Sequence, residues 1–497
     1  MSTSSGILRI AAGVACVVTC LYASTLQLHG ADFWLLAKIG EIIADQHAIP
    51  DTVLFPFTEI ASEKFNAHEW LACLFFHYAL KWIGEQWMPL LVGALGLTLF
   101  VSSSRLAYIR GHSNLAVALL GGLCALITEN YRHSLRPELL ALNIMVVFWI
   151  GLEQFRNKPD IESALLVWVT GVLWVNCHGS FILAPILVAI YTTGTYLQQM
   201  VDTKTWLVKP SGQVYALALL AALVCLSCLI NPFGWELIEF VFKFSGDPRL
   251  YGAIIEWFPT THFLGERWLW IIGSIWLLVL LVVVKNFRKI HMVDALVFAA
   301  FTALAFKAIR FPIYIGVMAA FVIPAYIPAQ WNAPQRQKYL YGVVIATALS
   351  LLTLAATFGN LSSVHPYSLG AWKLSKKMVN VLRNPAMHGN VYTSMEMGSE
   401  LIYLAYPRLK PSMDARIDSY GFDYYQYQKA LLFDDKLLEE FVHRYDVKYM
   451  LLKHDAMNQF IHLDAWKSGT WQDVMTDSFA VLLKRSDVSP QEVTPIQ

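Results

Sequence analysis

The sequence predicts an α-helical membrane protein with about eleven membrane-spanning helices and a C-terminal exterior α/β domain. Of its 497 residues, 56% are apolar and only 15% are charged, whereas soluble globular proteins carry about 25% charged residues. The apolar residues form long runs up to about residue 359, and no run after that point is long enough to span a membrane. Aromatic residues make up 13% of the chain, which excludes a disordered protein.

Eleven apolar runs approach the roughly 20 residues that a membrane-spanning helix needs. They are 7–29, 87–104, 113–128, 138–154, 162–177, 180–199, 213–230, 268–284, 292–308, 312–329 and 339–358. An odd number of spans places the two termini on opposite sides of the membrane.

Basic residues in the short connections set the predicted orientation, because cytoplasmic loops are rich in Lys and Arg. Those in alternate connections are Arg105, Arg110, Arg156, Lys158, Lys204, Lys209, Lys285, Arg288, Lys289, Arg336 and Lys338. This bias predicts a cytoplasmic N-terminus and an exterior C-terminus. This orientation requires that segment 68–83, with its interleaved charges, lies along the membrane surface and does not cross it. A short crossing by the same segment is the alternative.

The chain is therefore expected to have two domains. Residues 1–359 form the membrane domain, with a long first exterior loop at 30–86. Residues 360–497 form an exterior α/β domain, with strands at 390–393, 449–453 and 479–484 and helices at 394–405 and 434–444.

The composition also limits the partners. The net charge is +1, so a nucleic acid is not an expected partner. All seven cysteines lie in apolar segments before residue 360, so no disulfide framework is predicted.

Polar residues that interrupt apolar runs are candidates for function, because ionisable groups at membrane depth are costly. On the predicted exterior side these are Arg132, Arg136, Glu138, His178, Glu256 and Arg310, together with Asp32, His68 and Glu69 of the first loop. Basic groups facing carboxylates suit a phosphate or pyrophosphate with catalytic acids beside it.

Each of these residues also has a simpler interpretation. Asp32 can bind a divalent cation or act as a base, or it can cap a helix that begins near Phe33. Arg136 can extend its charge to the membrane surface, and His178 can be an ordinary helix-end histidine. Glu256 can pair locally with Arg249 or Arg267.

Several short motifs resemble those of the GT-C superfamily of membrane glycosyltransferases, within a group of bacterial inner-membrane proteins. They are D-x-W at Asp32 and Trp34, I-P-x-x-x-x-F at Ile49 to Phe55, H-E-W-L at His68 to Leu71, R-P at Arg136, W-x-N-x-H-G at Trp174 to Gly179, N-P-x-G at Asn231 to Gly234, E-W at Glu256 and D-x-R-x-D-x-Y at Asp414 to Tyr420. Many members carry an acidic pair in the first loop. Here Phe33 follows Asp32, so the second acid must be Glu69, Asp51 or Glu256.

The resemblance implies an inverting hexosyl or pentosyl transferase that uses a polyprenyl-phosphate sugar donor and an exterior glycan, lipid or protein acceptor. Asp32 and Glu69 would be catalytic, with Asp32 as the ligand of any divalent cation. Arg136, His178, Arg310, Glu256 and His68 would bind the donor phosphate. In the exterior domain, Asp414, Arg416 and Asp418 would bind the acceptor, and the alternative is that Arg416 bridges Asp414 and Asp418 in a turn.

Two other function classes fit the same residues. One is a transporter or flippase of a lipid-linked or anionic substrate, in which the buried charges form a binding site near the membrane midplane. The other is a non-catalytic scaffold that associates with envelope-polysaccharide assembly proteins.

Overall fold

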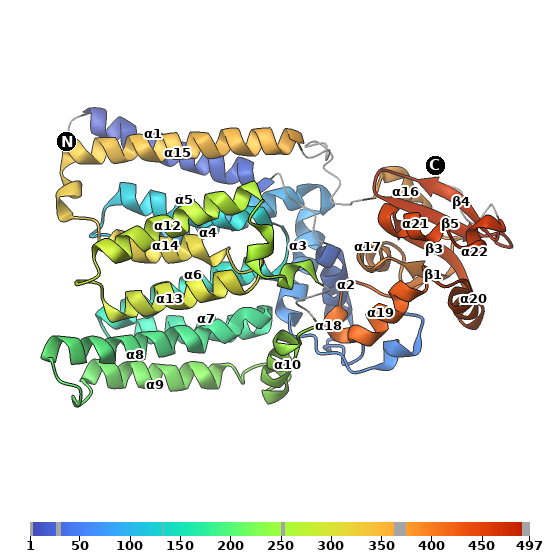
Figure 1. Ribbon diagram of the computed structural model, residues 1–497, viewed down its shortest axis with the longest axis horizontal. Coiled ribbons are helices and arrows are strands. Elements are labelled where there is room, and N and C mark those ends of the chain that lie inside the picture. The colour runs from blue at the N-terminus through green and yellow to red at the C-terminus, as the bar shows by residue number, and fades with distance from the viewer. Residues whose placement is uncertain (1–2, 26–30, 133, 250–253, 362–373, 490–497) are drawn as a thin grey trace. The chain divides into compact units, whose positions relative to one another are not determined.

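The computed structural model describes residues 3–25, 31–132, 134–249, 254–361 and 374–489 (Figure 1). Residue contacts divide the chain into two compact units. Unit 1 comprises 1–28 and 89–368, and unit 2 comprises 29–88 and 369–497. The first exterior loop therefore belongs with the C-terminal part of the chain, whereas the predicted domain boundaries place it with the membrane helices.

Unit 1 consists of helices, and each of the eleven predicted apolar runs coincides with one of them. These helices are α1 (Thr3–Thr25), α4 (Met88–Arg110), α5 (Leu115–Glu129), α6 (Pro137–Asn157), α7 (Ile161–Cys177), α8 (Leu183–Thr203), α9 (Gly212–Ser227), α12 (Arg267–Lys285), α13 (Met292–Lys307), α14 (Tyr314–Ala325) and α15 (Pro334–Leu361). A further helix, α10 (Trp235–Gly246), was not predicted.

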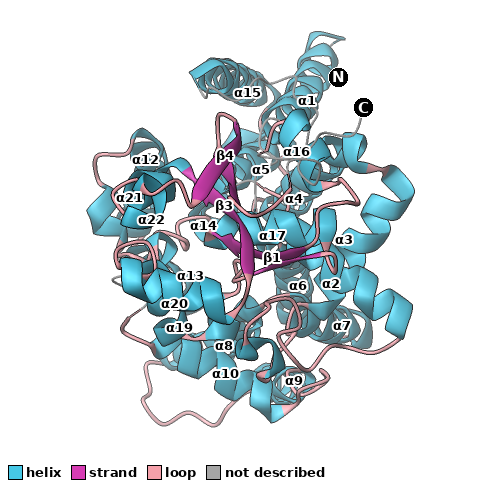
Figure 2. Ribbon diagram, turned by 90° about the vertical axis from the view of Figure 1, so that its right-hand side faces the viewer, coloured by secondary structure: helices cyan, strands magenta, loops and turns pink. Residues whose placement is uncertain are grey.

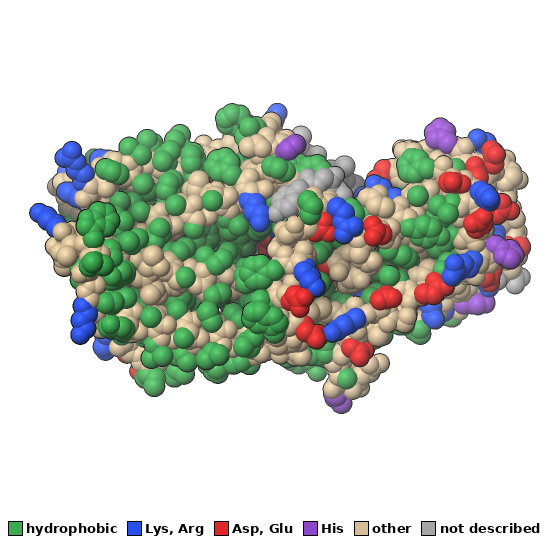
Figure 3. All heavy atoms as spheres, turned by 60° about the horizontal axis from the view of Figure 1, so that its bottom comes forward, with side chains coloured by type: hydrophobic (Ala, Val, Ile, Leu, Met, Phe, Trp, Pro, Cys, Tyr) green, Lys and Arg blue, Asp and Glu red, His purple; other side chains and the backbone are tan. Residues whose placement is uncertain are grey.

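Four helical segments in the described residues are long and apolar enough, by length and composition, to cross a membrane. They are Glu85–Arg110, Pro137–Asn157, Gly179–Thr203 and Arg267–Lys285. Others, such as the 12-residue α14, are shorter, so the total of about eleven spans stays a prediction. Figure 3 shows apolar side chains over much of the visible surface of unit 1, with Lys and Arg side chains at its left end.

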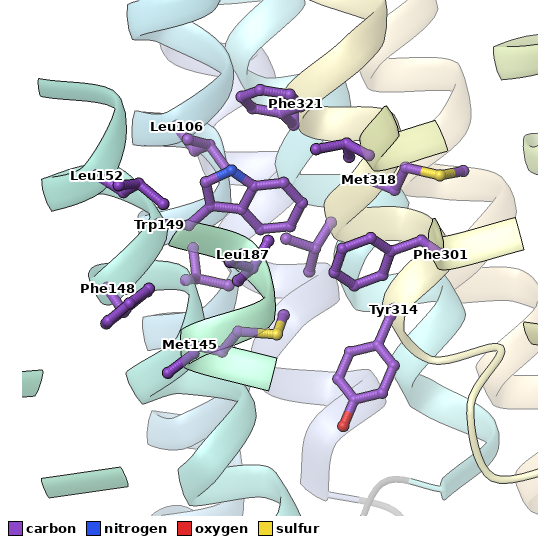
Figure 4. Packing of buried hydrophobic residues seen from close by; sticks show 14 of the residues in the cluster. Leu106, Met145, Phe148, Trp149, Leu152, Leu187, Phe301, Tyr314, Met318 and Phe321 are labelled. Atoms are coloured by element: carbon purple, nitrogen blue, oxygen red, sulfur yellow. The ribbon is translucent and has the colours of Figure 1, made fainter. Parts of the chain in front are cut away.

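The core of unit 1 surrounds Trp149 of α6 (Figure 4). Its indole ring lies 5.3 Å from the ring of Phe301 on α13 and 4.9 Å from that of Phe321 on α14. The indole N–H donates to the hydroxyl of Tyr191 on α8 at 2.9 Å. One side chain thus joins four helices through aromatic packing and one satisfied polar group.

A buried ion network joins helices of unit 1 near the C-terminal end of α6. Arg110 pairs with Glu153 of α6 and with Asp294 of α13, each at 2.7 Å. Tyr191 donates to Glu153 at 2.7 Å, and Tyr326, just after α14, donates to Asp294 at 2.6 Å. The two carboxylates are 2–3% exposed, so each needs these partners to remain charged in an apolar surrounding.

Unit 2 contains a five-stranded sheet with the strand order β2-β1-β3-β5-β4 (Figure 2). The strands are β1 (Gly389–Thr393), β2 (Leu409–Pro411), β3 (Val447–Lys453), β4 (Trp471–Thr476) and β5 (Ala480–Arg485). Strand β1 pairs in parallel with β2 and β3, and β5 pairs antiparallel with β3 and β4. The three predicted strands correspond to β1, β3 and β5.

Helices surround this sheet and include the two predicted ones, α17 and α20. The helices are α16 (Lys376–Leu382), α17 (Met395–Ala405), α18 (Ile417–Tyr420), α19 (Phe422–Ala430), α20 (Asp435–Arg444), α21 (His454–Phe460) and α22 (Asp464–Lys467). Strand β2 was missed because it has only three residues, and β4 because most of its side chains are not buried.

The first exterior loop adds α2 (Ala31–Gln46) and α3 (Trp70–Ile83) to unit 2. Trp34 of α2 packs on Tyr403 of α17, with ring centroids 4.8 Å apart. Helix α3 has 14 residues, a length of about 21 Å, which is less than the roughly 30 Å of a bilayer core. Its length therefore favours the surface arrangement over a crossing.

We predict that Gly316 sets the close approach of α14 to α5. A Cβ atom at this position would overlap the backbone of Cys124, and the Gly316 N–H donates to Thr128 Oγ1 at 3.1 Å. Replacing Gly316 with Ala should therefore destabilise unit 1 by about 1–3 kcal/mol, the usual cost of overpacking. Thermal unfolding in detergent measures this. The matched control is Gly273→Ala on α12, where no atom lies within 4 Å of a built Cβ; equal losses in the two variants would contradict the prediction.

Candidate functional site

A cluster of charged side chains lies where three connections of unit 1 meet. Arg132 ends the short helix η3 (Asn130–Arg132) after α5, and Arg136 and Glu138 stand at the start of α6. Pro137 at the first position favours the beginning of α6 here. Glu256 lies on the short helix η5 (Ile255–Trp257), and Arg310 lies between α13 and α14.

The carboxylates of Glu138 and Glu256 bridge the three arginines of this cluster. Arg132 lies 2.9 Å from Glu138 and 3.2 Å from Glu256. Arg136 lies 2.6 Å from Glu256, and Arg310 lies 3.7 Å from Glu138. The Arg310 guanidinium also lies 4.9 Å from the ring of Trp257. The site is therefore a connected network rather than a set of separate ion pairs.

A small hollow opens among these side chains. It is lined by Glu129, Arg132, Ser134, Arg136, Glu138, Leu139, Leu142 and Ile313. Glu129 is 3% exposed. It was not predicted as a site residue, because the predicted apolar run 113–128 ends one residue before it. Glu129 follows the end of one apolar run and Glu138 stands at the beginning of the next, so an acid at the edge of an apolar run is the signal that both residues share.

The most accessible part of the network is the pair formed by Arg136 and Glu256, whose side chains are 26% and 34% exposed. Burial raises the pKa of the Glu256 carboxyl, but Arg132 and Arg136 lower it more, so the pKa lies well below its usual range. Glu256 thus acts as an anion held by two guanidinium groups. A phosphate that replaces this carboxylate would find both donors already aligned.

His178 joins the same network from the end of α7. Its Nδ1 atom accepts the backbone N–H of Ser180 at 3.1 Å, so Nδ1 is unprotonated in this arrangement. Glu138 lies within electrostatic range of the imidazole. Arg136, His178, Glu256 and Arg310, which the sequence nominated as phosphate ligands, therefore lie around one carboxylate network. Arg249 pairs instead with Asp247, at 2.8 Å.

The other nominated residues belong to unit 2. Asp32 lies in the first turn of α2 and is half-buried, and Glu69 is the residue immediately before α3. His68 Nε2 lies 3.8 Å from a Glu69 oxygen. Burial raises the pKa of the Asp418 carboxyl, against the opposing effects of His68 and Arg416. His68 thus lies between one candidate catalytic acid and one acid of the C-terminal part.

Asp414 and Arg416 form a buried pair in unit 2. Arg416 donates to both oxygens of Asp414, at 2.9 and 2.7 Å, and the side chains are 8% and 0% exposed. Among the residues that the structure describes, no group of three or more His, Cys, Asp or Glu side chains could hold a metal ion. The divalent cation at Asp32 stays a prediction from the sequence.

The chain is similar in structure to an archaeal oligosaccharyltransferase from Archaeoglobus fulgidus. The apo crystal structure of that enzyme has a TM-score of 0.59 and 11% identity, over 92% of this chain and 71% of that one. The complex with an inhibitory peptide and a dolichol-phosphate gives the same values. The complex with Zn and sulfate has a TM-score of 0.53 and 11% identity, over 92% and 70% of the two chains.

No protein-family model and no curated protein matches the sequence. The structural similarity shows that the chain has a GT-C-like fold, as its motifs predicted.

We predict that the ion pairs of Glu256 stabilise unit 1 at neutral pH. Because its pKa is lower in the folded than in the unfolded protein, this stability is present above the ordinary glutamate pKa of about 4.3 and is lost as the pH falls below it. The free energy of unfolding of wild type should exceed that of Glu256→Gln by a constant amount between about pH 6 and 8. This difference should shrink towards about pH 3. Thermal unfolding measures it, with the exposed Glu162 replaced by Gln as a control. An advantage that does not shrink in acid would contradict the prediction.

Proposed function

We propose that this protein is a membrane glycosyltransferase that transfers a sugar from a polyprenyl-phosphate-linked donor to an exterior acceptor. The observation that carries the proposal is the connected network of three arginines and two glutamates, of which Arg132, Arg136 and Glu138 line a small hollow, in a chain with a GT-C-like fold. The dolichol-phosphate in a structure of the archaeal enzyme supports a lipid-phosphate donor. We place the protein in a bacterial inner membrane with a cytoplasmic N-terminus and unit 2 outside.

In the proposed reaction the donor phosphate takes the place of Glu256 beside Arg132 and Arg136. Arg310, near Glu138, adds further positive potential, and His178, whose Nδ1 accepts from Ser180, offers its Nε2–H as a neutral donor. When the bond between the anomeric carbon and the phosphate oxygen breaks, its electron pair passes to the phosphate. Fixed guanidinium donors stabilise that developing charge without reorganising.

The acceptor hydroxyl supplies the new bond. Its oxygen attacks the anomeric carbon from the face opposite the phosphate, and its proton passes to the carboxylate of Asp32, with Glu69 as the supporting acid. Direct displacement of this kind inverts the anomeric centre. The hydroxyl needs a base because it is a weak nucleophile while it keeps its proton.

Replacing Asp32 with Asn should lower the transfer rate by about 100-fold or more, the usual contribution of a general base, while polyprenyl-phosphate binding stays near the wild-type value. Release of polyprenyl phosphate from a radiolabelled donor by purified protein in detergent measures the rate. The matched control is Asp45→Asn, on the same helix α2 but exposed. Full activity of Asp32→Asn would exclude Asp32 as the base. Donor binding by wild type without any release would favour a transporter, and absence of both would favour a scaffold.

The arginine network should determine donor affinity rather than the fold of unit 1. Replacing Arg136 with Ala should weaken polyprenyl-phosphate binding by about 10- to 100-fold, because a charged hydrogen bond to phosphate contributes about 1.5–3 kcal/mol, and binding is measured at a temperature at which the variant, which has lost its pair with Glu256, remains folded. Fluorescence titration measures the affinity. The control is Arg249→Ala, at an exposed arginine that pairs with Asp247. An equal loss of affinity in the two variants would show that only the net charge of the protein matters.

A further inference from the structure

Arg416 lies in a buried contact between the first exterior loop and the C-terminal part of unit 2. Beyond its two bonds to Asp414, its Nη2 atom donates to the backbone oxygen of Val53 at 2.9 Å. Its guanidinium lies 5.1 Å from the ring of Phe55 and 4.7 Å from that of Phe65. One side chain of the C-terminal part therefore contacts the loop at two places that are ten residues apart in sequence.

The loop segment that Arg416 holds is folded back on itself. Val53 N–H donates to Glu63 O at 3.1 Å, and Phe65 N–H donates to Asp51 O at 2.7 Å. Phe55 and Phe65 are 0% and 5% exposed. Arg416 thus lies beside the two ends of a hairpin-like segment, and its outgoing end at Phe65 is followed within four residues by His68 and Glu69.

The same short stretch of the C-terminal part also reaches the residues after the hairpin. Asp418, two residues beyond Arg416, lies within electrostatic range of His68, and His68 Nε2 lies 3.8 Å from Glu69. Asp414 is kept in place by its pair with Arg416 and by a bond from its backbone N–H to the Tyr420 hydroxyl at 3.1 Å. Residues 414–418 therefore act on the loop at its entry, at its exit and beside Glu69.

We propose that Asp414 and Arg416 are positioning residues, which fix the first exterior loop so that His68 and Glu69 are held in place for the proposed reaction. This rests on the proposed function for its catalytic part. It replaces the acceptor-binding role that the sequence motif implied, because the buried Asp414–Arg416 pair offers almost no surface to an acceptor. Arg416 acts through the loop and touches no reacting atom.

The loop has a second contact with the C-terminal part that serves as a matched control. Glu59, at the tip of the hairpin-like segment, pairs with Arg444 at 2.5 Å, but both side chains are about two-thirds exposed. Exposed ion pairs contribute little to stability. Arg444→Ala therefore removes a charge and a loop contact from the same unit without removing the buried contact.

The first test is independent of activity and uses the purified full chain in detergent. In Arg416→Met we expect amide hydrogen exchange in residues 51–69 to become about tenfold faster, because local opening is less costly without the contact. Arg444→Ala should exchange as wild type does. If Arg416→Met fails to fold, Phe65→Leu decides, because it removes a ring from the loop side and leaves the Asp414–Arg416 pair intact. Unchanged exchange in the variant that folds would overturn the proposal.

The second test separates positioning from acceptor binding. In Arg416→Lys, which keeps the positive charge but has a single donor group, we expect kcat to fall by about tenfold, since small misplacements of catalytic groups slow a reaction strongly. The KM for acceptor and the affinity for polyprenyl phosphate should stay near wild type. A raised acceptor KM with unchanged kcat would overturn the positioning role. If wild type shows no transfer at all, the proposed function fails, while the exchange measurement still decides whether Arg416 fixes the loop.

Discussion

Burying an arginine is costly unless its charge is paired and its hydrogen bonds are accepted. Three places in the described part of the chain show such pairing with carboxylates. Arg110 is enclosed by Glu153 and Asp294, Arg132 lies between Glu138 and Glu256, and Arg416 is held by Asp414. The partners of Arg110 and Arg132 come from different helices or connections. Asp414 and Arg416 are close in sequence, but Arg416 also donates to Val53 of the first loop. Each pairing therefore brings separate parts of the chain together.

The three networks differ in how much of the charge remains available. The pairs of Arg110 and Arg416 are almost fully enclosed, and both guanidinium groups donate to carboxylates and to backbone oxygens. Such networks specify an arrangement of segments rather than a ligand. The network around Glu256 is more accessible, at 34% exposure, and the proposed function has its arginines exchange this carboxylate for a phosphate. Accessibility, rather than charge, distinguishes the candidate site from the structural pairs.

Much of the architecture was predictable because it depends on local composition. Apolar runs marked the described α-helices of unit 1 other than α10, and short apolar stretches marked β1, β3 and β5. The convergence of Arg136, His178, Glu256 and Arg310 was predictable as well, because the ends of antiparallel helices alternate between two faces of a bundle. Short or exposed elements such as β2 and β4 carry too weak a pattern to identify. Glu129 was missed because its polarity was assigned to a loop.

The amino-acid sequence by itself therefore determined the helical membrane part, the position of the α/β part and the residue types available for phosphate chemistry. Each of these follows from hydrophobic periodicity or from the cost of a charge in an apolar run. Only the tertiary structure decided that the first exterior loop belongs to unit 2, that Glu256 pairs with Arg132 and Arg136, and that Arg416 holds the segment before Glu69. Those contacts join residues from about 100 to more than 300 positions apart. These contacts form between charged residues that are distant in sequence and become neighbours only in the folded chain. A local sequence pattern therefore does not predict them.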